Sequence, residues 1–422
     1  MKISIIGCGY VGAVTGACFA GKGHEVTFVD VDGKKLDDFG SGRAPIYEPG
    51  LDDLLQGCKD RISTTMDIAE AVSATDLTFI CVGTPSNDDG SIDLGYVLSA
   101  AEEIGDALGE IDHFHTVVVK STVFPGTTGD QVRPLLEERS GKRAFEDFGL
   151  GSNPEFLKEG CAVRDFLSPD RIVIGAEDEQ TGSVMQELYA RFDCPKVAVP
   201  IKTAEMIKYT SNAFLATKIT FANEIGNLCK SLGIDSYEVF AGVGMDARIG
   251  PAFFRSGIGF GGSCFPKDLS ALIAGAERRG VDTALLKAVV SQNRVQPLKM
   301  IELLRKHLPD LRGRRIGLLG LAFKPDTDDV RESRAIPVVE LLTRQGAEVV
   351  AYDPMAMENF KKVCPGIEYA SSPAEALATD AVLILTEWSE FDDLDYHGKT
   401  VIDGRRVERA RSEAAVYEGV CW

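Results

Sequence analysis

The first half of the chain alternates short apolar runs with segments of helical periodicity. Strands are predicted at residues 2–6, 25–30, 77–82, 116–120 and 171–174. The run Val117-Val118-Val119 is apolar at every position, which suits a strand buried on both faces of a parallel sheet. The pattern therefore predicts a doubly wound α/β domain.

A different pattern follows, with longer helical segments around one irregular loop. Residues 203–232 contain no proline, and their apolar positions keep helical spacing, which predicts one long helix. A second helix is predicted at residues 283–307, bent near Pro297. The glycine-rich residues 248–268 between them are predicted to form a loop.

Strands and helices alternate again after Gly313, and strands are predicted at residues 315–319, 348–352, 381–385 and 400–402. The chain as a whole is predicted to be an α/β protein with two Rossmann-like doubly wound domains joined by a long central helix. We expect domain boundaries at residues 1–198, 199–308 and 309–422.

Composition narrows the class of protein. The formal net charge is −19, which argues against a nucleic-acid partner; it favours solubility, with adaptation to high salt as the alternative. No apolar run is long enough to cross a bilayer, and the chain begins directly in a strand-like segment, so we expect a cytoplasmic protein without a membrane partner. None of the ten cysteines forms a CxxC pair, so no metal site is expected.

A glycine-rich turn joins the first predicted strand to a helical segment. In the sequence Gly7-Cys8-Gly9-Tyr10-Val11-Gly12, the glycines permit a tight turn, close approach of a pyrophosphate, and packing of the helix on the strand. The next strand ends in Asp30, a carboxylate that accepts hydrogen bonds from ribose hydroxyls and repels a 2′-phosphate. This context predicts an NAD site.

A second glycine-rich segment, residues 257–263, leads to Cys264. Dense glycine lets the backbone fold tightly and leaves one side chain as the reactive group. Lys267 and Asp268 follow closely, and a nearby cation favours the nucleophilic thiolate. The alternative, a buried cysteine acting as a small hydrophobic residue, suits the other nine cysteines better.

Two polar residues share one face of the long predicted helix. Lys208 and Asn212 stand four residues apart, one helical turn, in a mostly apolar segment. A lone lysine there would as readily reach out to water, but the neighbouring asparagine favours a polar site.

Seven segments together resemble the UDP-glucose/GDP-mannose dehydrogenase family. They are residues 7–12, 82–85, 120–123, 153–160, 208–212, 259–268 and 324–327. Residues 213–219 and 246–250 look most like the UDP-glucose branch of the family. The similarity covers nearly the whole chain.

The resemblance implies an NAD-dependent four-electron oxidation of UDP-glucose to UDP-glucuronate. Cys264 would trap the aldehyde as a thiohemiacetal, which is oxidised to a thioester and hydrolysed. Residues 1–198 would bind NAD, residues 199–308 would carry the dimer contact and catalytic loop, and residues 309–422 would bind the UDP-sugar. A homodimer built on the central helix is implied.

The resemblance also assigns residues to roles. The implied catalytic residues are Cys264, Lys208, Asn212, Asp268, Glu155 and Thr122. Lys208 and Asn212 would stabilise an oxyanion, Asp268 would hold Lys208 or a water, and Glu155 and Thr122 would transfer protons through a water. The expected cofactor-binding residues are Gly7, Gly9, Tyr10, Val11, Gly12, Asp30, Lys35, Thr84, Thr122, Glu159, Lys267 and Arg331. The expected substrate-binding residues are Glu155, Phe156, Leu157, Lys158, Lys208, Asn212, Arg248, Phe260, Gly261, Lys324 and Arg405.

Some alternatives stay open. Arg248 is expected to reach a neighbouring subunit, and Arg406 competes with Arg405 for the substrate. GDP-mannose or a UDP-N-acetylhexosamine would serve as substrate with the same cysteine chemistry. A non-catalytic nucleotide-sugar-binding protein is a further alternative, which the complete set of candidate catalytic residues argues against.

Overall fold

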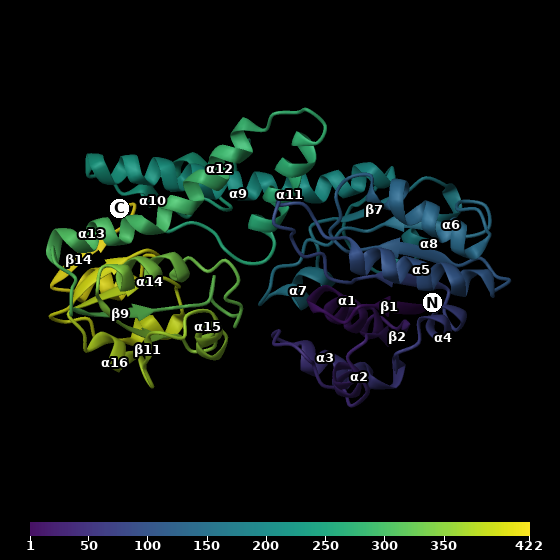
Figure 1. Ribbon diagram of the computed structural model, residues 1–422, viewed down its shortest axis with the longest axis horizontal. Helices are drawn as coiled ribbons and strands as arrows, with labels where there is room; N and C mark the ends of the chain where they lie inside the picture. Colours follow the sequence, from purple (N-terminus) through teal and green to yellow (C-terminus); the bar gives the residue numbers. More distant parts are fainter. The chain divides into compact units, whose positions relative to one another are not determined.

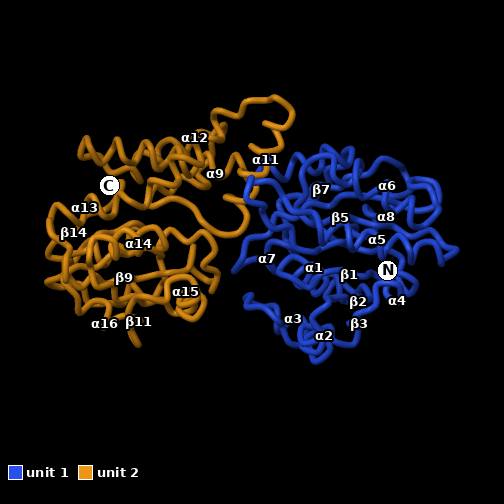
Figure 2. The backbone as a smooth tube through the Cα atoms, viewed as in Figure 1, with its two compact units in different colours: residues 1–211 blue, residues 212–422 orange.

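The computed structural model describes residues 1–422, which form two compact units, residues 1–211 and 212–422 (Figure 2). The boundary falls inside α9 (Ile201–Leu232), a single helix that contributes side chains to both units. The long helix predicted at residues 203–232 is therefore confirmed. The division into three domains stays a prediction.

Unit 1 contains an eight-stranded sheet with strand order β3-β2-β1-β4-β5-β6-β7-β8. The strands are β1 (Lys2–Ile6), β2 (Glu25–Val29), β3 (Ile62–Thr65), β4 (Leu77–Ile80), β5 (Thr116–Val119), β6 (Gly149–Ser152), β7 (Ile172–Ala176) and β8 (Lys196–Val199). All neighbours are parallel except β6 and β7. Five of these strands were predicted from the sequence, and β3, β6 and β8 were not.

Helices cover both faces of this sheet (Figure 1). They are α1 (Tyr10–Gly21), α2 (Gly33–Gly40), α3 (Leu51–Cys58), α4 (Ile68–Ser73), α5 (Gly95–Gly109), α6 (Arg133–Ser140), α7 (Ala162–Leu167) and α8 (Glu179–Leu188), with short helices at Lys59–Arg61 and Thr128–Val132. Val118 packs in one buried core, whereas Val117 and Val119 pack in the other. Because successive strand side chains point to opposite faces, β5 is buried on both, as its apolar run predicts.

Unit 2 begins with helices. After α9 come α10 (Ser236–Gly244), α11 (Phe265–Glu277), α12 (Ala284–Val295) and α13 (Lys299–His307), the last two separated by a 3-10 turn at Gln296–Leu298. The helix predicted at residues 283–307 is thus interrupted at Pro297, where a bend was predicted. The predicted loop at residues 248–268 was wrong at its end, since α11 begins at Phe265; Pro266 in the first helical turn was the signal.

The rest of unit 2 is a six-stranded parallel sheet in the order β11-β10-β9-β12-β13-β14. The strands are β9 (Arg315–Leu319), β10 (Glu348–Tyr352), β11 (Glu368–Tyr369), β12 (Ala381–Ile384), β13 (Thr400–Asp403) and β14 (Val416–Gly419). The helices are α14 (Ala335–Arg344), α15 (Met357–Val363), α16 (Pro373–Leu377) and α17 (Glu408–Glu413), with a 3-10 turn at Ser389–Asp393. The predicted fold class, two Rossmann-like sheets and a long central helix, is confirmed.

None of the helices combines the length and the apolar character that crossing a membrane requires.

Candidate active site

The turn between β1 and α1 leaves room for a ligand at its second glycine. Gly7 has φ of +93°, and a Cβ there would lie 2.9 Å from Val82. A Cβ on Gly12 would lie 1.9 Å from the carbonyl oxygen of Gly7, so helix and turn pack too closely for a side chain. A Cβ on Gly9 would meet no atom within 4 Å. The three glycines thus have the distinct roles that dinucleotide binding requires.

The carboxylate of Asp30 lies beside this turn. It accepts hydrogen bonds from the backbone N–H of Cys8 at 2.7 Å and of Asp32 at 3.0 Å, and Lys35 Nζ lies 3.6 Å from it. No side chain caps the N-terminus of α1, so its first N–H groups and the helix dipole face the turn. Anion-binding N–H groups next to a ribose-binding carboxylate fit NAD.

Glu48 links the glycine turn to the segment that carries Glu159, a link that the sequence analysis missed. Its buried carboxylate accepts hydrogen bonds from the Tyr10 hydroxyl and from the backbone N–H groups of Gly160 and Ala162, the latter two at 2.7 Å each. Burial and the Glu48 carboxylate raise the pKa of Tyr10 above its ordinary value, so the hydroxyl remains a donor. The predicted cofactor residues Tyr10 and Glu159 therefore belong to one hydrogen-bonded region.

At the ends of β4 and β5, the Thr84 hydroxyl donates a hydrogen bond to the carbonyl oxygen of Thr122 at 3.0 Å. Both residues were predicted near the cofactor. The structure brings them together although 38 residues separate them.

The buried ion pair between Lys208 and Glu155 is the main charged feature of unit 1. Lys208 Nζ lies 2.6 Å from Glu155 Oε1, and both side chains are about 5% exposed. Glu155 Oε2 also accepts a hydrogen bond from the backbone N–H of Leu157 at 2.6 Å. The sequence named both charged residues, but not their pairing, because they are 53 positions apart.

The ion pair keeps Glu155 ionised. Burial raises the pKa of Glu155, but the adjacent Lys208 ammonium and the Leu157 N–H outweigh it, so the pKa lies below its ordinary value. A carboxylate that is anionic at neutral pH is able to accept a proton during the reaction.

A second buried lysine, Lys120, was absent from the predicted site residues. Its Nζ donates to Asn153 Oδ1 at 2.8 Å, and Tyr189 donates to the same oxygen at 2.5 Å. Burial lowers the pKa of Lys120 to about 8. Asn153 precedes Glu155 by two residues, so Lys120 anchors the start of the predicted sugar-binding segment. An apolar strand ending in lysine was the available signal.

Residues 153–158 line a pocket of unit 1 together with Arg171. The Arg171 guanidinium lies 4.0 Å from the centre of the Phe156 ring, and Lys208 Nζ lies 5.5 Å from it. Lys158 pairs with Asp165 at 3.4 Å. Predicted substrate residues Glu155, Phe156, Leu157 and Lys158 thus share one pocket, to which Arg171 adds a cation that the sequence analysis missed.

In unit 2, Cys264 occupies the position just before α11, a helix of 13 residues, and its side chain makes no capping hydrogen bond to the helix. Its Sγ lies 3.6 Å from Ser263 Oγ, and the residue is half-buried. A helix N-terminus stabilises a negative charge, so this position favours the thiolate. The sequence indicated one cause of Cys264 reactivity, the nearby Lys267, and the helix N-terminus is a second.

Asp268, in the first turn of α11, binds the side chains of two other predicted site residues. Its fully buried carboxylate accepts hydrogen bonds from Asn212 Nδ2 at 2.6 Å and from Lys267 Nζ at 2.8 Å. Asn212 and Lys267 are thereby fixed in orientation on the same unit as Cys264. The expected contact of Asp268 with Lys208 or a water stays a prediction.

The loop before Cys264 is enclosed by protein. The Phe260 side chain is buried against Phe265, with ring centres 5.8 Å apart, and belongs to a core that includes Leu269. A Cβ on Gly261 would lie 2.2 Å from the carbonyl oxygen of Glu332. Neither position therefore offers a side chain to a substrate.

Arg331 and Arg248 are exposed, whereas Lys324 is partly buried. Arg331 pairs with Asp329 at 2.6 Å, and Arg248 pairs with Asp246 at 2.6 Å, with 88% of the Arg248 side chain exposed. Lys324 Nζ lies 5.9 Å from the Phe323 ring centre. The role of Arg248 at a neighbouring subunit stays a prediction.

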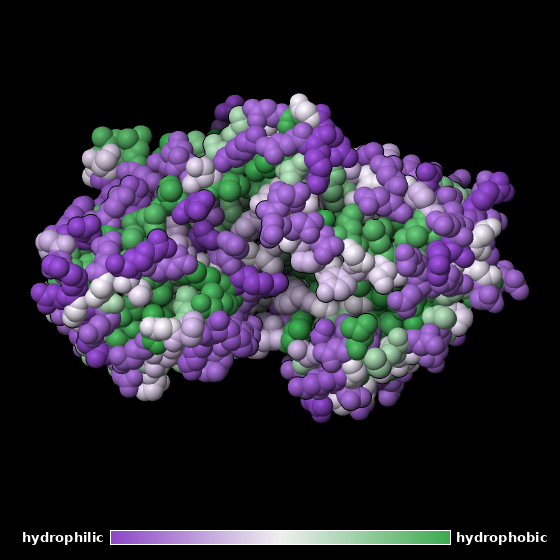
Figure 3. Space-filling model, in the orientation of Figure 1, coloured by the Kyte–Doolittle hydropathy of each residue, from purple (hydrophilic) through white to green (hydrophobic).

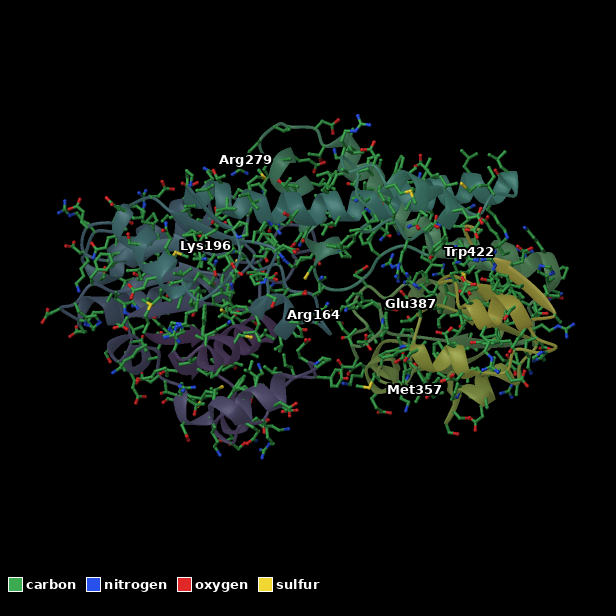
Figure 4. All side chains as sticks on the ribbon, turned by 180° about the vertical axis from the view of Figure 1, so that it is seen from behind. Arg164, Lys196, Arg279, Met357, Glu387 and Trp422 are labelled. Carbon is green, nitrogen blue, oxygen red and sulfur yellow. The ribbon has the colours of Figure 1, made fainter.

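Arg405 and Arg406 diverge. Arg406 stacks on Tyr237 at 4.3 Å and pairs with Asp235 at 3.1 Å and Glu408 at 2.8 Å. Arg405 uses only Nε, which donates to the Leu385 carbonyl oxygen at 2.8 Å and lies 3.5 Å from Glu387, labelled in Figure 4. Two nitrogens of Arg406 are held by carboxylates, whereas Arg405 is held through one, which favours Arg405 for a ligand.

Three family models match the chain in succession. They describe the UDP-glucose/GDP-mannose dehydrogenase family: its NAD binding domain over residues 1–193, its central domain over 202–295, and its UDP binding domain over 317–410. The first match confirms the prediction of NAD as the cofactor.

Curated relatives and solved structures agree with the family models. UDP-glucose 6-dehydrogenase AglM of Haloferax volcanii is 48% identical, with both chains fully covered. GDP-mannose 6-dehydrogenase of Pseudomonas aeruginosa is 42% identical, also over both full chains. The structure of a UDP-glucose dehydrogenase from the hyperthermophilic archaeon Pyrobaculum islandicum superposes with a TM-score of 0.96 at 48% identity, covering 100% of this chain and 98% of that one.

Proposed function

This chain belongs to the UDP-glucose/GDP-mannose dehydrogenase family of NAD-dependent enzymes, and we propose that it oxidises UDP-glucose to UDP-glucuronate through a thioester on Cys264. The placement of Cys264 at the N-terminus of α11, on the unit that holds Asn212 and Asp268, carries the chemical part of the proposal. The similarity to UDP-glucose 6-dehydrogenases at 48% identity supports the substrate.

The first oxidation converts the C6 alcohol to an aldehyde. Each of the two oxidations removes a hydride and a proton, and bound NAD supplies the hydride acceptor. The ionised Glu155 carboxylate accepts the proton, directly or through a water held with Thr122. Gly9 and Asp30 hold the dinucleotide on unit 1.

The Cys264 thiolate then attacks the aldehyde. A bond forms between Sγ and C6, and the carbonyl oxygen takes the negative charge, which Lys208 and Asn212 stabilise with charged and neutral donors. Protonation of this oxygen gives a thiohemiacetal. The covalent bond holds the substrate in place between the two oxidations.

The second oxidation removes a hydride from C6 and the hydroxyl proton, which leaves a thioester. Water adds to the thioester carbonyl, the C–S bond breaks, and the Cys264 thiolate leaves. In sum, one alcohol, one water and two NAD give one carboxylate, two NADH and three protons.

Absorbance of NADH tests this function. With UDP-glucose limiting and NAD in excess, we expect two NADH per sugar and no free aldehyde. Cys264→Ala should form no UDP-glucuronate, and Cys264→Ser should stall after the first oxidation, because a serine hydroxyl is a far weaker nucleophile than a thiolate and traps the aldehyde poorly. Two NADH per sugar from the serine variant would contradict the thioester.

GDP-mannose is the second candidate substrate. The 42% identity to the Pseudomonas aeruginosa enzyme favours it, and the same Cys264 chemistry would serve. Assays of UDP-glucose, GDP-mannose and UDP-N-acetylhexosamines side by side separate these cases. Failure with all three would leave a non-catalytic nucleotide-sugar-binding protein.

A homodimer through the central helix is part of the proposal. Phe214, Phe221, Leu228 and Leu232 in α9 are all more than half exposed, and their spacing places them along one side of the helix. Surface over the end of α9 is hydrophobic (Figure 3). Such a stripe is typical of a helix that packs against another copy. Phe221→Asp should convert a dimer to monomers in light scattering.

In this dimer the exposed Arg248 side chain would reach the substrate of the partner subunit.

We further propose that residues 1–198 bind NAD, that residues 199–308 carry the dimer contact and the catalytic loop, and that residues 309–422 bind the UDP-sugar. We also propose a cytoplasmic location, where Cys264 stays reduced. Cell fractionation with immunodetection tests the location.

A further inference from the structure

Buried amide side chains hold the glycine-rich loop that presents Cys264. A loop of this composition has few side chains of its own to fix it, and glycine has a wide choice of backbone conformations. In unit 2, its backbone is instead bound by Asn223 of α9, Asn293 of α12 and Gln296, which follows α12. All three are at least 94% buried.

Asn293 makes two hydrogen bonds to one residue of the loop. Its Oδ1 accepts from the backbone N–H of Phe260 at 2.8 Å, and its Nδ2 donates to the carbonyl oxygen of Phe260 at 2.9 Å. A primary amide offers a donor and an acceptor side by side, as this pairing requires. A Cβ on Gly259 would lie 2.4 Å from Asn293 Oδ1, so the glycine at 259 allows the amide to approach.

The other two amides hold the start of the loop. Gly257 N–H donates to Asn223 Oδ1 at 2.8 Å, and Gln296 Nε2 donates to the Gly257 carbonyl oxygen at 2.7 Å. Asn227 orients Gln296 by donating to its Oε1 at 2.8 Å. Further along, Gly262 N–H donates to the carbonyl oxygen of Arg331 at 2.9 Å. The loop is thus held on two sides up to two residues before Cys264.

We propose that Asn293 is the positioning residue for the nucleophile: its amide fixes the Phe260 backbone and thereby the placement of Cys264 Sγ. This inference rests on the proposed function. Asn293 contacts the loop backbone and acts on the reaction only through it. Because a displacement of about 1 Å at a reacting atom costs on the order of 100-fold in rate, such an anchor controls turnover more than binding.

The variant Asn293→Asp tests the pairing with almost no change in shape. The carboxylate still accepts from Phe260 N–H, but it cannot donate to the Phe260 carbonyl oxygen; the protonated acid can do both. Burial favours the protonated acid. Arg334 opposes it, because its Nη1 lies 3.4 Å from the backbone carbonyl oxygen of residue 293; Arg334 also pairs with Glu332.

At pH 8 we expect kcat of Asn293→Asp to fall by about 10-fold to 100-fold, with KM for NAD and UDP-glucose within about two-fold of the parent. The ratio of variant to parent kcat should recover as the pH falls towards 5.5. Hydrogen exchange followed by mass spectrometry should show faster exchange in the peptide covering residues 257–264 at pH 8 and parent-like exchange at the lower pH.

Two further variants complete the test. Thr379→Val removes hydrogen bonds to the carbonyl oxygens of Ala376 and Ala381 elsewhere in unit 2, and should alter neither kcat nor exchange in the loop. If Asn293→Asp does not fold, Gln296→Glu replaces it, because the glutamate carboxylate cannot donate to the Gly257 carbonyl oxygen. The same changes in kcat and hydrogen exchange are expected.

A folded variant with parent kcat and parent exchange in the loop would overturn the proposal. So would lower stability with unchanged kcat, because that marks a merely structural residue. If the parent enzyme yields no NADH with any nucleotide sugar, the proposed function fails, whereas the exchange comparison still decides whether Asn293 holds the loop.

Discussion

The two sheets begin with the same construction. In unit 1, β1 is followed by Gly7, with φ of +93°, and Gly7 N–H donates to the Val29 carbonyl oxygen at 2.8 Å. In unit 2, β9 is followed by Gly320, with φ of +94°, and Gly320 N–H donates to the Tyr352 carbonyl oxygen at 2.9 Å. Both glycines turn the chain tightly against a neighbouring strand end.

An aspartate follows the second strand in each case, but its partners differ. Asp30 accepts two backbone hydrogen bonds and lies next to Lys35. Asp353 is fully buried and accepts from five donors, the backbone N–H groups of Leu321, Ala322, Met355 and Ala356 and the indole of Trp388. No oxygen of Asp353 is left for a ribose.

The chain after the glycine differs as well. In unit 1, α1 starts at Tyr10, so a helix N-terminus faces the turn; in unit 2 the next helix, α14, starts only at Ala335. The same local device thus serves as a ligand site in one sheet and as a structural anchor in the other. What decides between them is the occupancy of the carboxylate and the position of the helix.

Asp353→Ala should give the largest effect. It leaves five donors without an acceptor in a buried place, so we expect unfolding free energy to fall by about 4 kcal/mol or more. The two tryptophans, Trp388 and Trp422, both lie in unit 2, so fluorescence in a urea titration reports on this unit. A loss below about 1 kcal/mol would show that Asp353 is no anchor.

Lys120 in unit 1 and Asp403 in unit 2 are buried titratable residues, and their contributions to stability should change with pH in opposite directions. Burial lowers the pKa of Lys120, after β5, to about 8, and burial raises the pKa of Asp403, in β13, to about 6. Between pH 8 and 10.5 the unfolded chain binds more protons at Lys120, so its contribution to stability rises with pH. Between pH 3.8 and 6 the folded chain binds more at Asp403, so its contribution falls as pH rises.

Each change should amount to about 3 kcal/mol across its window. It is measured as the difference in unfolding free energy between the parent and Lys120→Met or Asp403→Asn at each pH. Parallel curves for parent and variant would contradict the assignment for that residue.

Asp30→Ala should affect the cofactor and leave the fold intact. Losing charge-assisted hydrogen bonds to the ribose should raise KM for NAD by about 30-fold, while unfolding free energy changes by about 1 kcal/mol or less. Steady-state kinetics and a urea titration measure the two effects. A stability loss as large as that of Asp353→Ala would remove the distinction between the two aspartates.

Gly9→Ala should produce the smallest effect, confined to NAD. Its Cβ meets no atom within 4 Å, so the fold should tolerate it, whereas the pyrophosphate would be displaced and KM for NAD should rise by about 10-fold. Gly320→Ala is the counterpart, because its Cβ would lie 2.5 Å from Thr386 and destabilise unit 2 instead. An unchanged KM in the first variant would place the pyrophosphate elsewhere.

Much of the fold was predictable because its strands and helices have strong local patterns. The strands missed in unit 1 include β6, whose sequence Gly-Leu-Gly-Ser reads as a turn. It is a strand because β5 pairs with it on one side and β7 on the other. Strand formation in such segments depends on neighbours that local propensity does not contain.

The sequence by itself determined the glycine turn, the long helix α9 and the nucleophile Cys264, since each depends on residues that are close in the chain. Only the tertiary structure decided that Lys208 pairs with Glu155, that Asn293 holds the Phe260 backbone, and that Asp30 but not Asp353 keeps room for a ligand. Those outcomes depend on which residues, distant in the chain, the packing places next to a buried polar group, because a buried polar group must find its hydrogen-bond partner among the groups around it.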